Sequence, residues 1–130
     1  GPRQLAASQA RAAAMFAEYD ALFAAGFDAF VCPTVATSKI VADLDFLTDE
    51  LEIDGQSVDP FSDWLLTPAF NLLYTVPVVN VPTGFDSNRV PTGMQIAARS
   101  YDDLTAFRLA AAHADARTPL FTGELFPTFT

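Results

Sequence analysis

Hydrophobic and polar positions in the first part of the chain follow the period of a helix. In residues 4–25, apolar side chains recur every three or four positions and form one stripe: Ala12, Met15, Phe16, Tyr19, Leu22 and Phe23. Gly26 follows at the position where a glycine commonly ends a helix. This pattern predicts one long amphipathic helix that packs its stripe against another part of the fold.

A short continuous apolar run, residues 29–32, comes directly after this helix. Such a run is typical of a strand that is buried on both faces. Pro33 indicates that the strand ends there or lies near an edge of its sheet. A helix that leads into a buried strand predicts half of a parallel βαβ unit, whose first strand is missing from this sequence.

Residues 36–60 show no hydrophobic period and carry many acidic side chains. We expect a long acidic loop with at most one helical turn, and a chain reversal at the "IDGQ" stretch. Asp43 and Asp45 are spaced like the first two ligands of a calcium loop. The glycine and the final glutamate of that motif are absent at the required spacing, which favours a solvated loop.

The second half predicts a helix and then a hairpin. Residues 59–73 should be helical, with Asp59 as N-cap and Pro60 in the first turn, and with a kink or break near Thr67 because Pro68 follows it. Two apolar segments should form an antiparallel hairpin around the Gly- and Pro-rich residues 82–93, with the turn within 84–90: Val76–Val81 and Met94–Ala98.

A last helix is predicted over residues 103–117, with Asp102 as its cap. Its apolar positions fall on one face, formed by Leu104, Phe107, Ala111 and Ala114. The remaining residues, 118–130, are rich in apolar side chains but show no period, so they predict no local structure.

Composition limits the kind of protein. The chain has 130 residues, enough for one domain, and its apolar content of 51% is high for a domain of this size. Seven basic against 16 acidic residues give a net charge of -9, which argues against binding to nucleic acid. No apolar run approaches the roughly 20 residues that span a bilayer, and no signal peptide is visible, so we expect a cytoplasmic protein without a membrane partner. Gly1-Pro2 is interpreted as a remnant of tag removal.

The residues alone predict no complete active site. Cys32 is the single cysteine, so an internal disulfide is excluded, and nothing in the sequence places it beside His113, the single histidine. One histidine and one cysteine do not supply a zinc site. The glycines have neither dinucleotide-binding nor P-loop spacing, so we expect no cofactor and no metal.

Two stretches nevertheless resemble the C-terminal part of amidase signature family hydrolases. They are "FNLLYTVPVVNVPTGF" and "VPTGMQIAARSYDDLTAFRLAAAHA", and the preceding "YDALFAAGFDAFVCPT" is similar to the family's helix-then-strand segment. The resemblance covers about Leu5 to Ala116. It rests on Asn71, Pro77, Val81, Pro82, Gly84, Pro91, Gly93, Gln95, Arg99, Asp102, Asp103 and Ala110. Arg89 departs from it, because the family often has glycine there.

The resemblance implies an α/β fold in which residues 3–130 are the C-terminal portion of an amidase domain, with a partial mixed sheet and flanking helices. It also implies hydrolysis of a carboxamide by two serines and a lysine. The chain has no Ser-Ser pair, and Lys39, its single lysine, stands alone in the acidic loop. We therefore expect no catalytic residue here and no activity of the chain by itself.

The resemblance further implies that this part completes the sheet and forms one wall of the substrate pocket. The candidate substrate-binding residues are Thr34, Asp63, Trp64 and Asn71. Two of them have simpler explanations, since Asn71 could cap a helix and Trp64 could belong to the core. The expected partners are the remainder of the amidase domain or a second copy of the chain, and a small amide substrate in the complete enzyme. The alternative is a free-standing, non-catalytic module that binds a protein through an exposed sheet edge.

Overall fold

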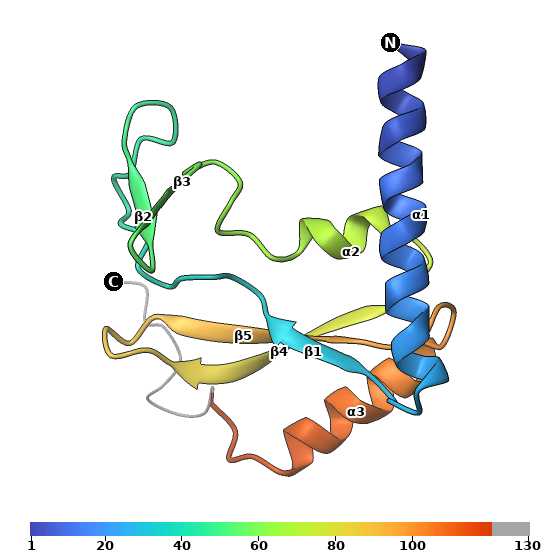
Figure 1. Ribbon diagram of the computed structural model, residues 1–130. Coiled ribbons are helices and arrows are strands. Elements are labelled where there is room, and N and C mark those ends of the chain that lie inside the picture. The colour runs from blue at the N-terminus through green and yellow to red at the C-terminus, as the bar shows by residue number, and fades with distance from the viewer. Residues whose placement is uncertain (121–130) are drawn as a thin grey trace.

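The computed structural model describes residues 1–120 and shows an α/β fold in which helices flank a small antiparallel sheet (Figure 1). The sheet has the strand order β1-β5-β4, and a separate pair is formed by β2 and β3. No helix in this part of the chain is long and apolar enough to cross a membrane. The elements are α1 (Pro2–Ala24), β1 (Phe30–Pro33), β2 (Leu51–Ile53), β3 (Gln56–Val58), α2 (Pro68–Leu72), β4 (Val78–Phe85), β5 (Pro91–Ala97) and α3 (Asp103–Asp115).

Helix α1 is the predicted amphipathic helix, and it ends as predicted. Gly26 has a φ of 95° and donates its backbone N–H to Phe23, while the N–H of Phe27 bonds back to Leu22. This double closure satisfies carbonyl groups that the last helical turn leaves free, and glycine adopts its left-handed backbone without strain. The C-terminal half of α1 packs on the sheet through Tyr19, whereas the N-terminal half extends away from the rest of the chain (Figure 1).

Strand β1 forms where a strand was predicted, but the prediction that it is buried on both faces is wrong within the described residues. Phe30 is 39% exposed and Val31 is 51% exposed. The cause is its position, because β1 is an outer strand whose one partner among residues 1–120 is the antiparallel β5. Pro33 ends the strand, which agrees with its predicted position near an edge.

The segment 36–60 contains a hairpin that the sequence analysis missed. Strands β2 and β3 pair antiparallel around Asp54 and Gly55, whose φ angles are 51° and 76°. Two positive φ angles at the centre of a two-residue loop are the signature of a type I′ turn, and Asp-Gly is a preferred pair for it. The turn at "IDGQ" is therefore confirmed, but the flanking residues form strands rather than loop.

The helix predicted over 59–73 is present only at its end. Pro68 begins α2, with Thr67 before it as N-cap, so the proline starts a helix instead of kinking one. Asp59 does cap a turn, since its side chain accepts the N–H of Phe61 at 2.7 Å. That turn does not propagate, because Leu65 leaves it to form a bridge with Val35 beyond β1.

The predicted hairpin of β4 and β5 is confirmed, with its turn within 84–90. The strands extend further into residues 82–93 than expected, since β4 reaches Phe85 and β5 begins at Pro91. A bulge between Pro82 and Gly84 accommodates the proline, which cannot donate a ladder hydrogen bond. Arg89 lies in the turn with a φ of 64°.

Helix α3 begins as predicted, because the carboxylate of Asp102 accepts the N–H of Thr105 at 3.1 Å. The predicted apolar face of the helix is exposed in this chain, at Leu104, Phe107, Ala111 and Ala114. The helix instead packs through Ala106, which is fully buried, and it lies against β4 and β5. Small side chains allow this close approach, so the bulky apolar positions are left on the outside. The unassigned tail lies largely outside the described residues.

The two faces of the sheet are covered by different helices. Helices α1 and α2 lie on one side of it and α3 lies on the other (Figure 1). The core on the α1 side is made of Tyr19, Leu73, Val76 and Ala97, with Met15, Phe23, Phe70 and Val78 packed around them. This core occupies one end of the face, and the other end of the same face carries the polar side chains described next.

Candidate functional site

A row of polar side chains crosses the sheet on the face that α1 and α2 cover. The register places Cys32 of β1 opposite Gln95 of β5, and Gln95 opposite Asn80 of β4. Directly opposed residues in antiparallel strands project to the same face. Two residues away on each strand, the same face carries Phe30 of β1, Ala97 of β5 and Val78 of β4. The face therefore changes from apolar to polar within two residues.

Thr34 and Asn80 are joined across the middle strand. The hydroxyl of Thr34 donates to Oδ1 of Asn80 at 2.6 Å, although β5 lies between their strands. Gly93 makes this possible, since a Cβ there would lie 2.9 Å from Thr34 Oγ1 and 3.0 Å from Asn80 Oδ1. The hydrogen bond therefore occupies the space that a side chain at position 93 would fill.

Gln95 is the buried member of the row, with only 3% of its surface exposed. Its Nε2 donates to the carbonyl oxygen of Pro33 at 3.1 Å and to Sγ of Cys32 at 3.4 Å. Burial raises the pKa of the Cys32 thiol, and the hydrogen bond from Gln95 opposes that rise. Cys32 is therefore a protonated thiol that packs in the sheet, and it does not have the lowered pKa of a reactive cysteine.

Asn80 and Gln95 of this row border an open hollow of roughly 540 Å³ between α2 and the sheet. Its lining combines polar and apolar side chains: Thr67, Phe70, Asn71, Tyr74, Val76, Val78, Asn80 and Gln95. Asn71, predicted to bind substrate, therefore borders the same hollow as Asn80. It lies within α2 and not at its end, where Leu73 is the C-cap, so capping does not explain it.

Thr34 and Trp64 are also brought close to each other, through their backbones. The carbonyl of Thr34 accepts the N–H of Leu66 at 3.2 Å, and the carbonyl of Trp64 accepts the N–H of Ala36 at 2.8 Å. The indole of Trp64 is half-buried and donates to Pro60 at 2.9 Å. Trp64 therefore anchors its own turn against the end of β1, and it is not among the residues that line the hollow.

Asp63 is exposed and bonds within its own turn. Its carboxylate accepts the backbone N–H of Asp59 at 3.1 Å and the hydroxyl of Ser62 at 3.2 Å. It does not line the hollow either. Of the predicted substrate-binding residues, the structure thus places Asn71 at the hollow and Thr34 one hydrogen bond from it, with Trp64 and Asp63 on the adjoining turn.

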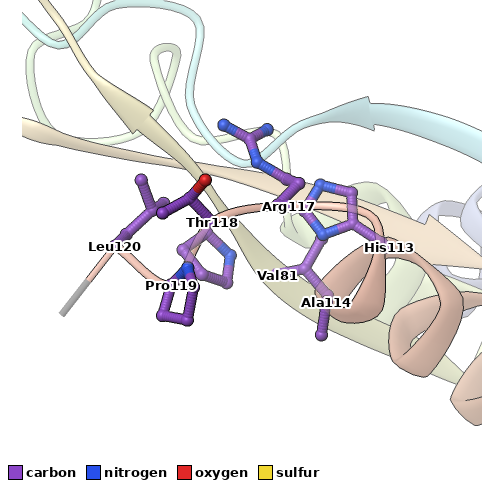
Figure 2. A pocket seen from close by; sticks show the side chains of 8 residues that line it. Val81, His113, Ala114, Arg117, Thr118, Pro119 and Leu120 are labelled. Carbon is purple, nitrogen blue, oxygen red and sulfur yellow. The ribbon is translucent and has the colours of Figure 1, made fainter. Parts of the chain in front are cut away.

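A second hollow, of roughly 190 Å³, lies on the α3 side of the chain (Figure 2). It is lined mainly by apolar groups from β4 and the end of α3: Val81, Pro82, His113, Ala114, Arg117, Thr118, Pro119 and Leu120. The guanidinium of Arg117 donates to the carbonyl of Thr83 at the bulge of β4. His113 is thus on α3, whereas Cys32 projects to the face that α1 and α2 cover, so the two are not paired.

Asn80, Gln95 and Gly93 were not identified as site residues from the sequence. A signal for Asn80 was present in the predicted hairpin. Val78, Asn80 and Pro82 are spaced two apart and so share one face of a strand, and Asn80 is the polar residue between two apolar ones. The sequence could not show that β1 lies beside β5, with Cys32 opposite Gln95, because this depends on the order of the strands in the sheet. Among residues 1–120, no three His, Cys, Asp or Glu side chains are grouped to hold a metal ion.

Comparison with known proteins identifies the family. The family model described as Amidase matches residues 3–106. An acylamidase from Rhodococcus erythropolis is 37% identical over 86 residues, which cover 65% of this chain and 17% of that protein. Two glutamyl-tRNA(Gln) amidotransferase A subunits, from Bacillus thuringiensis (strain Al Hakam) and Bacillus cereus (strain B4264), are each 32% identical over 92 residues, or 71% of this chain and 17% of theirs. The chain thus matches about a sixth of the length of these relatives.

Proposed function

Because the chain belongs to the amidase family, we propose that it supplies the C-terminal part of an enzyme that hydrolyses carboxamide C–N bonds. In this proposal, residues 3–130 complete the sheet of the amidase domain and form one wall of its substrate pocket. The observation that carries the proposal is the polar end of the sheet face, where Asn80 and Asn71 border an open hollow and Thr34 is hydrogen-bonded to Asn80. A wall with an apolar floor and a few fixed polar groups is typical of small-molecule sites.

The wall would bind and orient the amide while the reacting groups come from elsewhere in the enzyme. The described residues hold no serine pair, and Lys39 is exposed and lies after β1 in the 36–60 segment. A lysine that serves as a base in this family must lose its proton, which requires a dry pocket. Lys39 has no such surroundings in this chain, so we propose that it takes no part in catalysis. The chain by itself would then be inactive and would need no cofactor.

A free-standing binding module is the second candidate, and the exposed apolar surfaces favour it. The outer edge of β1 has no strand beside it among residues 1–120, and the outer face of α3 presents Leu104 and Phe107. Such surfaces normally mark an interface with another chain or domain. In the amidase proposal the same surfaces would contact the remainder of the enzyme. A cytoplasmic location stays a prediction for both candidates.

Two measurements separate the candidates. The intact mass of the natural gene product should exceed 14.0 kDa by several-fold if the chain is part of an amidase, and should equal it if the chain is a free-standing module. The isolated chain should release no product from a panel of aryl amides and nitrophenyl esters. Turnover that disappears in Lys39→Ala would contradict the proposal, because it would show that the chain carries its own catalytic lysine.

A further inference from the structure

We infer that Asn80 and Gln95 form a binding pair for a carboxamide group, and that Thr34 positions Asn80 for this task. The inference rests on the proposed function for the biological ligand, but the pair is defined by the geometry of this chain alone. It names the groups in the hollow that would bind the ligand, the atoms they would use and the chemical groups they would reject.

Gln95 supplies the hydrogen-bond acceptor. Its NH2 group is engaged by the carbonyl of Pro33, which can only accept, so the amide orientation of Gln95 is determined. Its Oε1 has no hydrogen-bond partner among residues 1–120. Every fully buried side-chain oxygen or nitrogen in that part of the chain has a partner, so this Oε1 is not fully buried. Gln95 lines the hollow, and we infer that its accessible Oε1 faces it. The hollow therefore has an acceptor whose direction is held by the sheet.

Asn80 supplies the donor. Its Oδ1 accepts the hydroxyl of Thr34 at 2.6 Å, which leaves the Nδ2 group without a partner in the described chain. Asn80 also lines the hollow, and it stands directly opposite Gln95 in the register of β4 and β5. Opposed side chains in antiparallel strands lie close together on one face. An N–H donor and a C=O acceptor are therefore presented side by side.

A carboxamide matches this pair, because it offers one C=O acceptor for Asn80 and N–H donors for Gln95. A carboxylate offers only acceptors and would face the Gln95 oxygen unpaired, and the chain's net charge of -9 also disfavours an anion. The neighbouring Phe70, Val76 and Val78 provide an apolar surface for the rest of the ligand. The expected ligand is thus an amide with an apolar or aromatic substituent.

The test is a titration of the isotope-labelled chain with benzamide, followed by nuclear magnetic resonance of the side-chain amides. Benzamide should shift the Asn80 and Gln95 signals in a saturable way, and benzoate should not. N,N-dimethylbenzamide, which lacks the N–H donors, should bind about tenfold more weakly, as expected for one lost hydrogen bond. Asn80→Ala should weaken benzamide binding by about tenfold, and Thr34→Val should weaken it by a smaller factor. Asn88→Ala is the matched control, because Asn88 is an exposed asparagine in the turn of the same hairpin, and it should leave binding unchanged.

Equal responses to benzamide and benzoate would overturn the inference, and so would unchanged binding in Asn80→Ala. Because Asn80 is exposed, this variant should fold, and its backbone spectrum shows whether it does. The outcome is independent of the proposed function. Benzamide binding by a chain whose natural product proves to be 14.0 kDa would retain the pair and reject the amidase proposal. If the natural product is a larger, active amidase whose affinity for benzamide is unchanged in Asn80→Ala, the amidase proposal is retained and the binding pair is rejected.

Discussion

Tyr19 of α1 and Ala98, just past the end of β5, are joined by a buried hydrogen bond from the tyrosine hydroxyl to the backbone carbonyl at 2.8 Å. The ring of Tyr19 makes edge contacts with the rings of Phe23, Phe30 and Phe70, with centroids 5.1, 6.4 and 6.3 Å away. One side chain therefore links the long helix to β1, α2 and the end of the central strand. The apolar stripe of α1 predicted this helix–sheet contact, but the hydrogen bond depends on a carbonyl 79 positions away.

Replacing Tyr19 with phenylalanine should lower the free energy of unfolding by about 1–2 kcal/mol, because the ring contacts stay while a buried carbonyl loses its donor. Urea denaturation measures the change. Tyr101→Phe is the control, since Tyr101 is 79% exposed and its hydroxyl has no protein partner among the described residues. Equal stabilities of the two variants would show that the Tyr19 hydrogen bond does not contribute.

Stability should also fall at high pH because of Tyr19. Burial raises the pKa of its hydroxyl from 10.0 to about 12. The unfolded chain therefore releases this proton first, so the contribution is complete below pH 10 and is lost as the pH rises from 10 towards 12. A titration followed by tyrosinate absorbance should show a late phase, and that phase should be absent in Tyr19→Phe. A wild-type titration with no phase beyond that of free tyrosine would contradict the prediction.

Gly93→Ala should destabilise the fold by about 1–3 kcal/mol, since its new methyl group would overlap the Thr34–Asn80 hydrogen bond. A Cβ at this position would lie 2.9 Å from one oxygen and 3.0 Å from the other. The same change should cost clearly less in a chain that already carries Thr34→Ala and Asn80→Ala, because both oxygens are then gone. A double-mutant cycle of unfolding free energies measures the difference. An equal cost in both backgrounds would mean that the glycine is needed for another reason.

The sequence predicted the elements whose signals are local. The period of the α1 stripe, Gly26 after the helix, and the Asp102 cap each depend on a few neighbouring residues, and each was confirmed. The errors concern relations that no local pattern contains. The burial of Val31 depends on which strands flank β1, and this is not visible in the residues of the strand itself. The Thr34–Asn80 pair was missed for the same reason.

The backbone of Arg89 explains why glycine would suit this position of the turn. Its φ of 64° lies in the left-handed region, which costs a residue with a Cβ about 1–2 kcal/mol and glycine little. Arg89→Gly should therefore leave stability unchanged or raise it by up to about 1 kcal/mol, after the greater freedom of glycine in the unfolded chain is deducted. Ser87→Gly in the same turn is the control and should be destabilising, because its φ is not positive. Thermal unfolding of the two variants makes the comparison, and a loss of stability in Arg89→Gly would contradict the strain argument.

The isolated chain should not be a clean monomer. Leu104 and Phe107 leave 59% and 63% of their surfaces exposed on one face of α3, and Val31 leaves 51% exposed on the outer strand. Apolar faces and open strand edges of this kind associate with another chain in water. The net charge of -9 opposes association only weakly, because salt at physiological strength screens charges beyond about 8 Å. Light scattering at micromolar concentration should show species larger than 14.0 kDa, together with binding of an apolar dye.

Phe107→Glu tests whether the face of α3 is responsible, because a carboxylate in the middle of an apolar contact loses its water without gaining a partner. It should reduce both the associated species and the dye signal. Leu5→Glu is the matched control, since Leu5 is 62% exposed but lies on the part of α1 that extends away from the sheet. If both variants still associate, the edge of β1 becomes the surface to change next. A monodisperse 14.0 kDa wild-type chain without dye binding would show that these residues fold as a self-sufficient domain, and the free-standing module would then replace the amidase wall as the better account.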